Sequence, residues 1–160
     1  MIPWWEITLR LLFAGLIGGV IGWERERRAK PAGLRTHILV SAAAATYVLA
    51  AEQVALLYGE PVDAMRAMAG IAGGVGFMGA GVILRSKGEV RLLTTAAALW
   101  ADAALGLAAG LGMYYIGALA TVIVLVVLEL LPALEHRSLK EGKAEEPDIE
   151  DQDSGELSDD

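Results

Sequence analysis

The chain has no cysteine and only two histidines, His37 and His136, among its 160 residues. The lack of cysteine excludes disulfide bonds and thiolate metal sites. Two histidines far apart in sequence do not by themselves suggest a zinc site. No set of nucleophile, base and acid is apparent either, so the sequence predicts a protein that is not an enzyme and that has no metal site or cofactor.

Polar residues are scarce outside the C-terminal segment. The composition is 55% hydrophobic with a mean hydropathy of +0.49, which is too apolar for a soluble domain of this size. Residues 135–160 contain 11 acidic and three basic residues, whereas residues 1–134 have a net charge of +1. Because residues 1–134 have too few polar side chains to cover a soluble bundle, the sequence predicts that their partner is the lipid bilayer.

The uneven charge predicts two regions. Residues 1–134 form a transmembrane domain, and residues 135–160 form an acidic, disordered cytoplasmic tail whose last part is too polar to bury a core. The N-terminus has no basic segment before its apolar run and no small-residue cleavage site after it. This pattern indicates a retained span and not a signal peptide.

Five segments approach the roughly 20 apolar residues that a helix needs to cross a bilayer. Each segment ends at a glycine, a proline or a charged turn. The five are about Ile2–Trp23, Ile38–Leu57, Met65–Leu84, Leu92–Gly110 and Met113–Leu131. The sequence therefore predicts an all-α, polytopic transmembrane helix bundle of about five spans. The short gap between the last two leaves open four spans with a re-entrant hairpin.

Basic residues are concentrated on one side of this arrangement. Eleven of the 13 lie in the first loop, the third loop and the start of the tail. The positive-inside rule then places the N-terminus outside and the C-terminus in the cytoplasm. An odd number of spans also puts the two termini on opposite sides, so the two observations agree.

Glycines recur at helical spacing in the predicted spans, as at Gly18 and Gly22 in the first. Small faces of this kind let transmembrane helices approach each other closely. The alternative is a pathway along which the backbone comes near another molecule, since glycine costs helix stability and its density needs a reason. We predict a helix-packing role for Gly15, Gly18, Gly22, Gly74, Gly76, Gly79 and Gly81.

The stretch Gly74-Val75-Gly76-Phe77-Met78-Gly79 also has the spelling of the GxGxxG dinucleotide fingerprint. That fingerprint requires a strand before it and a helix after it. Here it lies inside a membrane-length apolar run that a basic loop follows, so a dinucleotide site is disfavoured.

Charged residues crowd the connection between the first two spans. If the first helix continues into it, Glu24 meets Arg28 and Glu26 meets Lys30 at the favourable i,i+4 spacing. Arg25 and Glu26 also extend the glycine face, so at least one of them should face another helix. The simplest interpretation is that these charges pair with one another at the end of the helix and fix the orientation of the span in the membrane. A nucleic-acid arm is disfavoured because the two acids cancel charge that phosphate binding would use.

Two polar side chains lie at membrane depth, Arg10 in the first span and Asp102 near the middle of the fourth. An isolated charge there is costly, so we predict that they pair across the bundle or line one polar cavity. The alternative for Arg10 is a side chain that extends to the membrane interface. Glu52, near a span end, is expected to reach the head groups. Glu60 and Asp63 are only a weak signal for a hard cation such as Mg²⁺.

Three motifs in order resemble the MgtC/SapB membrane proteins. The first is Gly18-Gly19-Val20-Ile21-Gly22-Trp23-Glu24-Arg25-Glu26, followed by Pro31-Ala32-Gly33-Leu34-Arg35-Thr36-His37; the second is Gly74-Val75-Gly76-Phe77-Met78-Gly79-Ala80-Gly81; the third is Leu93-Thr94-Thr95-Ala96-Ala97 with Leu99-Trp100. The resemblance implies a multi-pass protein of the bacterial plasma (inner) membrane. Some family members are linked to survival in low magnesium and to virulence, by modulating ATP synthase and not by carrying Mg²⁺.

The chain departs from the family pattern in two ways. MgtC has an ACT-like cytoplasmic domain after its last helix, whereas this chain resembles a short form with only the acidic tail. Leu92 stands where the motif often has glycine, and Asp102 stands where a small or hydroxyl residue is usual. The resemblance implies that the functional candidates are Glu24, Arg25, Glu26, Arg35, Thr36, His37, Thr94, Thr95 and Trp100.

These features together predict a non-enzymatic regulator of magnesium, ion or energy homeostasis. Its expected partner is another membrane protein or a second copy of the chain, and no nucleic acid. The alternative is a small cation transporter or channel with a polar path through the glycine-rich third span and Asp102. A third possibility is a scaffold that only oligomerises through its glycine faces.

Overall fold

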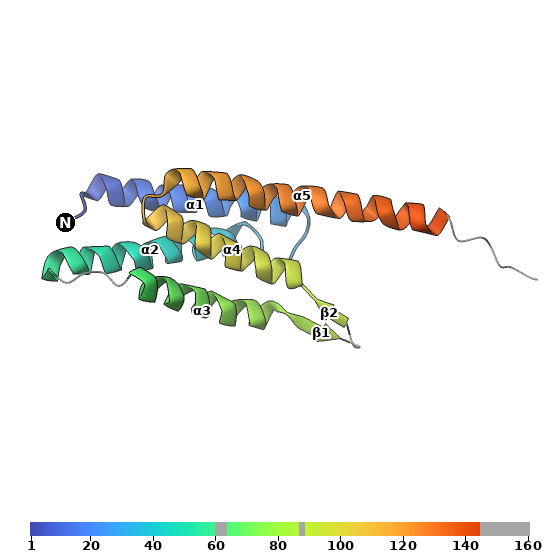
Figure 1. Ribbon diagram of the computed structural model, residues 1–160, viewed down its shortest axis with the longest axis horizontal. Helices are drawn as coiled ribbons and strands as arrows, with labels where there is room; N and C mark the ends of the chain where they lie inside the picture. Colours follow the sequence, from blue (N-terminus) through green and yellow to red (C-terminus); the bar gives the residue numbers. More distant parts are fainter. Residues whose placement is uncertain (60–63, 87–88, 145–160) are drawn as a thin grey trace, which may run out of the picture. The chain divides into compact units, whose positions relative to one another are not determined.

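A computed structural model of the chain describes residues 1–59, 64–86 and 89–144. It divides into two compact units, Met1–Leu125 and Val126–Asp160, which are described separately. Five helices make up most of the described chain (Figure 1): α1 (Trp4–Arg27), α2 (Leu34–Tyr58), α3 (Ala64–Val82), α4 (Leu93–Gly110) and α5 (Tyr114–Ala144).

Each of the five helices has a segment long and apolar enough to cross a membrane. This confirms the prediction of an all-α membrane bundle with five spans. The last two spans are separate helices, because a tight turn at Gly112 divides them with φ at +72°. In this turn the N–H of Met113 donates to the carbonyl of Ala108 at 2.8 Å, a helix ending that favours glycine. Which terminus faces outward stays a prediction.

The third loop contains a short hairpin that the sequence did not predict. Strands β1 (Leu84–Ser86) and β2 (Glu89–Arg91) pair antiparallel, with Arg85 opposite Val90. The strand pairing provides hydrogen-bond partners for the backbone groups that follow α3. In an unpaired loop these groups would hydrogen-bond to water instead.

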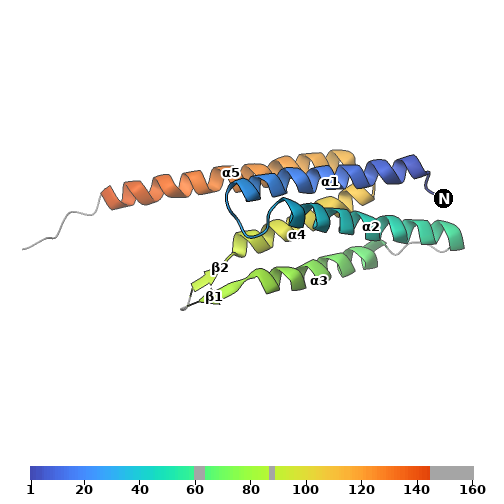
Figure 2. The ribbon, with the colours of Figure 1, turned by 180° about the vertical axis from the view of Figure 1, so that it is seen from behind.

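Helices α1, α2 and α4 pack side by side as the core of the first unit (Figures 1 and 2). Glycine makes this packing possible. A Cβ atom on Gly106 of α4 would lie 2.7 Å from the Cα of Ser41, and one on Gly22 of α1 would lie 2.7 Å from the Cα of Leu34. At Gly18 it would lie 2.9 Å from a backbone carbon of α2. The packing role predicted for Gly18 and Gly22 is therefore confirmed.

Four other glycines make no close helix contact within the described chain, so their packing role stays a prediction. A Cβ added at Gly15, Gly74, Gly76 or Gly81 would meet no atom within 4 Å, whereas at Gly79 it would touch Ala96 at 3.6 Å. The physical reason is that α3 contacts the core through larger side chains, such as Ile71, Val75 and Val82. The glycine spacing is present, but no described helix packs against it.

The GxGxxG stretch lies in the interior of helix α3. It is not the turn between a strand and a helix that a dinucleotide site requires. The dinucleotide interpretation is therefore excluded by the local structure.

Helix α5 begins against α1 in the first unit. The rings of Phe13 and Tyr114 meet edge to face with centroids 5.2 Å apart, a favourable aromatic geometry. The helix extends past residue 134, the predicted end of the transmembrane domain, as far as Ala144. The rest of the predicted disordered tail lies outside the described residues, and the division at 134 stays a prediction.

Candidate functional site

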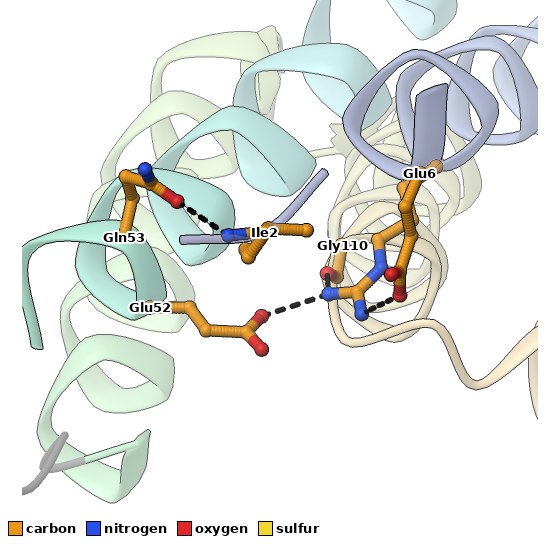
Figure 3. Close-up of polar contacts among 6 residues, drawn as sticks. Ile2, Glu6, Glu52, Gln53 and Gly110 are labelled. Carbon is orange, nitrogen blue, oxygen red and sulfur yellow. Dashed lines mark hydrogen bonds and ion pairs between the residues drawn. The ribbon is translucent and has the colours of Figure 1, made fainter. Parts of the chain in front are cut away.

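Arg10 is the centre of a polar cluster that joins three helices (Figure 3). Its side chain is 8% exposed. One terminal nitrogen donates to Glu52 Oε2 of α2 at 2.7 Å and to the carbonyl of Gly110, at the end of α4, at 2.9 Å. The other donates to Glu6, one turn away on α1. We call Arg10, Glu6, Glu52 and Gly110 the Arg10 cluster.

The Arg10 cluster closes one end of the core. Gly110 is the last residue of α4, so its carbonyl has no partner within that helix, and the guanidinium of Arg10 takes that place. Beside the cluster, the backbone N–H of Ile2 donates to the side-chain oxygen of Gln53 at 3.1 Å. Ion pairs and hydrogen bonds thus connect the start of α1 to the ends of α2 and α4.

The partners of Arg10 correct two predictions. Arg10 does not pair with Asp102, and Glu52 binds the guanidinium of Arg10 at 2.7 Å where head-group contact was expected. Gly110, which Arg10 contacts, lies eight residues after Asp102 on α4, about 12 Å along the helix axis. The two polar side chains therefore do not share a cavity. Glu6 was missed, although its i,i+4 spacing to Arg10 was a usable signal.

Asp102 pairs with His37, a motif residue on α2. Nδ1 of His37 lies 3.3 Å from Oδ2 of Asp102, and both side chains are 0% exposed. The residues one turn further along both helices also meet, Ser41 with Gly106. The turn after that brings Ala45 against Gly110, so α2 and α4 run in the same direction with a fixed register.

Glu24 and Arg25 lie at the end of α1, where they are 3% and 2% exposed. Oε1 of Glu24 lies 2.7 Å from Nε of Arg28, and Oε2 of Glu24 lies 3.1 Å from Nε of Arg25. The i,i+4 pair of Glu24 and Arg28 is confirmed. The prediction that Arg25 or Glu26 faces another helix is also confirmed, because Glu26 accepts a hydrogen bond from Leu34, the first residue of α2.

Glu26 has a different partner from the one predicted. Its Oε2 accepts the backbone N–H of Leu34 at 2.8 Å, and the predicted pair with Lys30 is replaced by this bond. Leu34 is the first residue of α2, and the preceding Gly33 has no side chain that could cap the helix. Glu26 therefore satisfies a free N–H at the start of α2 from the end of α1.

The remaining motif candidates divide between interior and surface. Thr95 is 2% exposed and belongs to the interior, whereas Trp100 is 53% exposed. Arg35 and Thr94 are exposed, and Thr36 is half-buried. Within the described residues no group of three or more His, Asp or Glu could hold a metal ion; Glu60 and Asp63 lie outside them.

The chain matches a known protein family. The model of the MgtC family matches residues 11–137. The chain belongs to the MgtC family.

Its relatives within the MgtC family are longer proteins. The chain is 40% identical over 136 residues to YhiD of Escherichia coli K12, which has the provisional name of a magnesium transporter; the match covers 82% of this chain and 63% of YhiD. It is 41% identical over 133 residues to MgtC of Brucella abortus, covering 81% and 54%. It is 43% identical over 123 residues to MgtC of Salmonella typhimurium, covering 77% and 51%. The chain thus spans about half to two thirds of these curated relatives, and no solved structure matches it.

Leu92, which departs from the MgtC family motif, has an unusual backbone conformation. It precedes α4 in a left-handed conformation, with φ at +70° and ψ at +18°. A side chain with a Cβ is strained there, at a cost of roughly 1–2 kcal/mol, whereas glycine is not. The glycine that the resemblance implies at this position therefore matches the geometry, and leucine is accommodated at a cost.

A groove lies between α2 and α3 of the described chain. Its volume is about 710 Å³, and its lining includes Val40, Tyr47, Ala67, Gly74 and Met78. The lining is almost entirely apolar, so the groove provides no polar path for an ion.

Proposed function

We propose that this protein is a non-enzymatic regulator of magnesium, ion or energy homeostasis in the bacterial inner membrane. We propose further that it acts by contact with another membrane complex. Membership of the MgtC family supports a link to magnesium. The observation that favours regulation over transport is the closed packing of α1, α2 and α4.

The helices of this core are in close contact where α2 meets α1 and α4. Backbone atoms of α2 occupy the places where Gly18 of α1 and Gly106 of α4 would have side chains. The polar groups at membrane depth are paired in two separate places, Arg10 at one end and His37 with Asp102 further along. A transport path would need such groups to follow one another along a cavity.

Three exposed motif residues support a partner outside the chain. Arg35, Thr94 and Trp100 belong to stretches that resemble the MgtC family, yet they do not pack in the interior of this chain. An exposed tryptophan is a common anchor in protein–protein contacts. We infer that these residues contribute to a surface for another membrane protein.

A small cation transporter remains the second candidate. It is favoured by the transporter name of YhiD, to which the chain is 40% identical, and by the open glycines of α3. A transporter would have to move ions along the outer side of α3, with a second copy or lipid completing the path.

Two measurements on the same preparation test the proposal. The first is co-purification of the full chain with inner-membrane complexes, including the ATP synthase that the resemblance implies. We expect Trp100→Ala to reduce recovery of the partner at least tenfold. Leu39→Ala is the matched control, because Leu39 is an exposed residue outside the motifs, and it should leave recovery unchanged.

The second measurement is Mg²⁺ flux into proteoliposomes that contain the purified chain. We expect no flux above that of empty vesicles. Saturable flux above that of empty vesicles, without a co-purifying complex, would favour the transporter and contradict the regulator.

A further inference from the structure

His37 and Asp102 form a buried ionisable pair that the proposed function does not use. Nδ1 of His37 lies 3.3 Å from Oδ2 of Asp102, and both side chains are completely buried. They come from different helices, α2 and α4, which contact each other closely one and two turns further along. Whatever changes the charge of this pair therefore acts on the contact between two core helices.

The number of protons on the pair decides its charge. With one proton the pair is neutral overall, whether the proton is on the imidazole or on the carboxyl group, or is shared between them. Losing that proton to water leaves a net charge of −1, and gaining a second leaves +1. A net charge in an apolar interior is unfavourable unless water or another charge reaches it.

No other charge in the described core compensates the pair. On α1 the residues that face His37 are Gly18 and Gly22, which have no side chains. The next ionisable residues of α1 are Glu24 and Arg25, and Glu24 forms ion pairs with both Arg25 and Arg28.

The other helices add nothing ionisable to the surroundings of the pair. On α2 the next buried polar side chain is Ser41, whose hydroxyl donates to the carbonyl of Ala14 at 2.9 Å, and the nearest charged residue, Arg35, is exposed. On α4 the flanking side chain is the buried Leu99. Helix α3, which packs against α4, contains one ionisable residue, Arg66, near its first turn and away from its end next to the hairpin.

We propose that His37 and Asp102 form a proton-binding site whose occupancy sets the contact between α2 and α4. With one proton bound, the pair is neutral and the helices close on each other. When the pair becomes charged, water must reach it, and the helices have to separate there because Ser41 and Gly106 leave no space. The site is independent of the proposed function, since a regulator and a transporter could both use it.

The lack of cysteine makes the distance between α2 and α4 directly measurable. Spin labels are placed at two exposed positions, Leu39→Cys on α2 and Ala104→Cys on α4. The full chain is studied in lipid vesicles between about pH 5 and pH 9, the range in which histidine changes charge. Nitrogen NMR of the His37 ring is recorded in parallel, in a His136→Gln background that leaves one histidine.

We expect the ring signal of His37 and the distance between the labels to change at the same pH. In Asp102→Asn, which keeps a hydrogen-bonding group without an acidic proton, the pair cannot become negative, so any separation of the labels that the wild type shows on losing its proton at high pH should be absent. His37→Gln combined with Asp102→Asn gives a pair without any titratable group, which should keep the short distance over the whole pH range. Glu52→Gln is the matched control in the Arg10 cluster and should keep the pH response of the wild type.

Three results would overturn the proposal, and two of them come from the wild type alone. One is a His37 ring that does not change protonation between pH 5 and pH 9, which would leave a purely structural pair. Another is a distance that stays constant while the ring titrates. The third is a separation of the labels at high pH in Asp102→Asn equal to that of the wild type.

Discussion

Helices α3 and α4 are spans of similar length and composition with different surroundings. Both are rich in glycine and alanine, yet 61% of the membrane-length window of α4 is buried within the chain and only 11% of that of α3. In α4 the backbone of α2 occupies the space beside Gly106 and Gly110, whereas Gly70, Gly73 and Gly74 of α3 have no neighbour within 4 Å. The same pattern of small residues therefore has a structural role in one helix and no partner in the other.

The difference shows that glycine spacing identifies where a helix could approach, and not whether one does. Glycine lowers helix stability by roughly 0.5–1 kcal/mol relative to alanine. In α4 this cost is offset by the contact with α2. In α3 the chain itself offers no compensation, so adding a methyl group should have opposite effects in the two helices.

The largest effect is expected for Gly106→Ala. The added Cβ would lie 2.7 Å from the Cα of Ser41, and backbone atoms cannot move aside as the tip of a side chain can. We expect a loss of stability of about 3 kcal/mol, the upper range for overpacking a core. Unfolding of the purified protein in mixed micelles measures it, and an unchanged midpoint would mean that α2 and α4 are not in contact.

A smaller effect of opposite sign is expected for Gly73→Ala on α3. No atom lies within 4 Å of the added methyl group, so the gain in helix propensity is not offset, and stability should rise by about 0.5–1 kcal/mol. The same unfolding assay measures it. A clear destabilisation would show that another chain packs against this face of α3.

The smallest effect is expected for Leu92→Gly, at the start of α4. Relief of the left-handed strain at φ +70° is partly cancelled by the greater freedom of glycine in the unfolded chain. We expect stability to rise by no more than about 1 kcal/mol. Leu93→Gly, at the next residue and inside the helix, is the matched control and should lower stability. If both substitutions changed stability in the same way, backbone strain at Leu92 would not be the cause.

Local patterns in the sequence predicted the local features of the structure. The apolar runs predicted the five spans, and the spacing of Glu24 and Arg28 predicted their ion pair, because both depend only on positions within one helix. The partner of Asp102 could not be predicted in this way. Its position on the helix places it at membrane depth, but the register of α2 against α4 decides that it meets His37 and not Arg10.

The contacts of the glycines and of the helix cap could not be predicted from spacing within one helix either. Spacing alone gave Gly18 of α1 and Gly74 of α3 the same role, although only Gly18 has a neighbour. Glu26 was expected to pair within its own helix, whereas it caps the following one at Leu34. That partner depends on the path of the loop between α1 and α2, which no periodic pattern describes.

The Arg10 cluster has a consequence for the order in which the protein is assembled. Glu6 lies on the same helix as Arg10, so the guanidinium has a counter-ion as soon as α1 forms. Glu52 is added when α2 has been synthesised, and the carbonyl of Gly110 only at the end of α4. The charge of Arg10 thus enters the membrane already paired, and its last hydrogen bond forms only after the ribosome has completed the fourth helix.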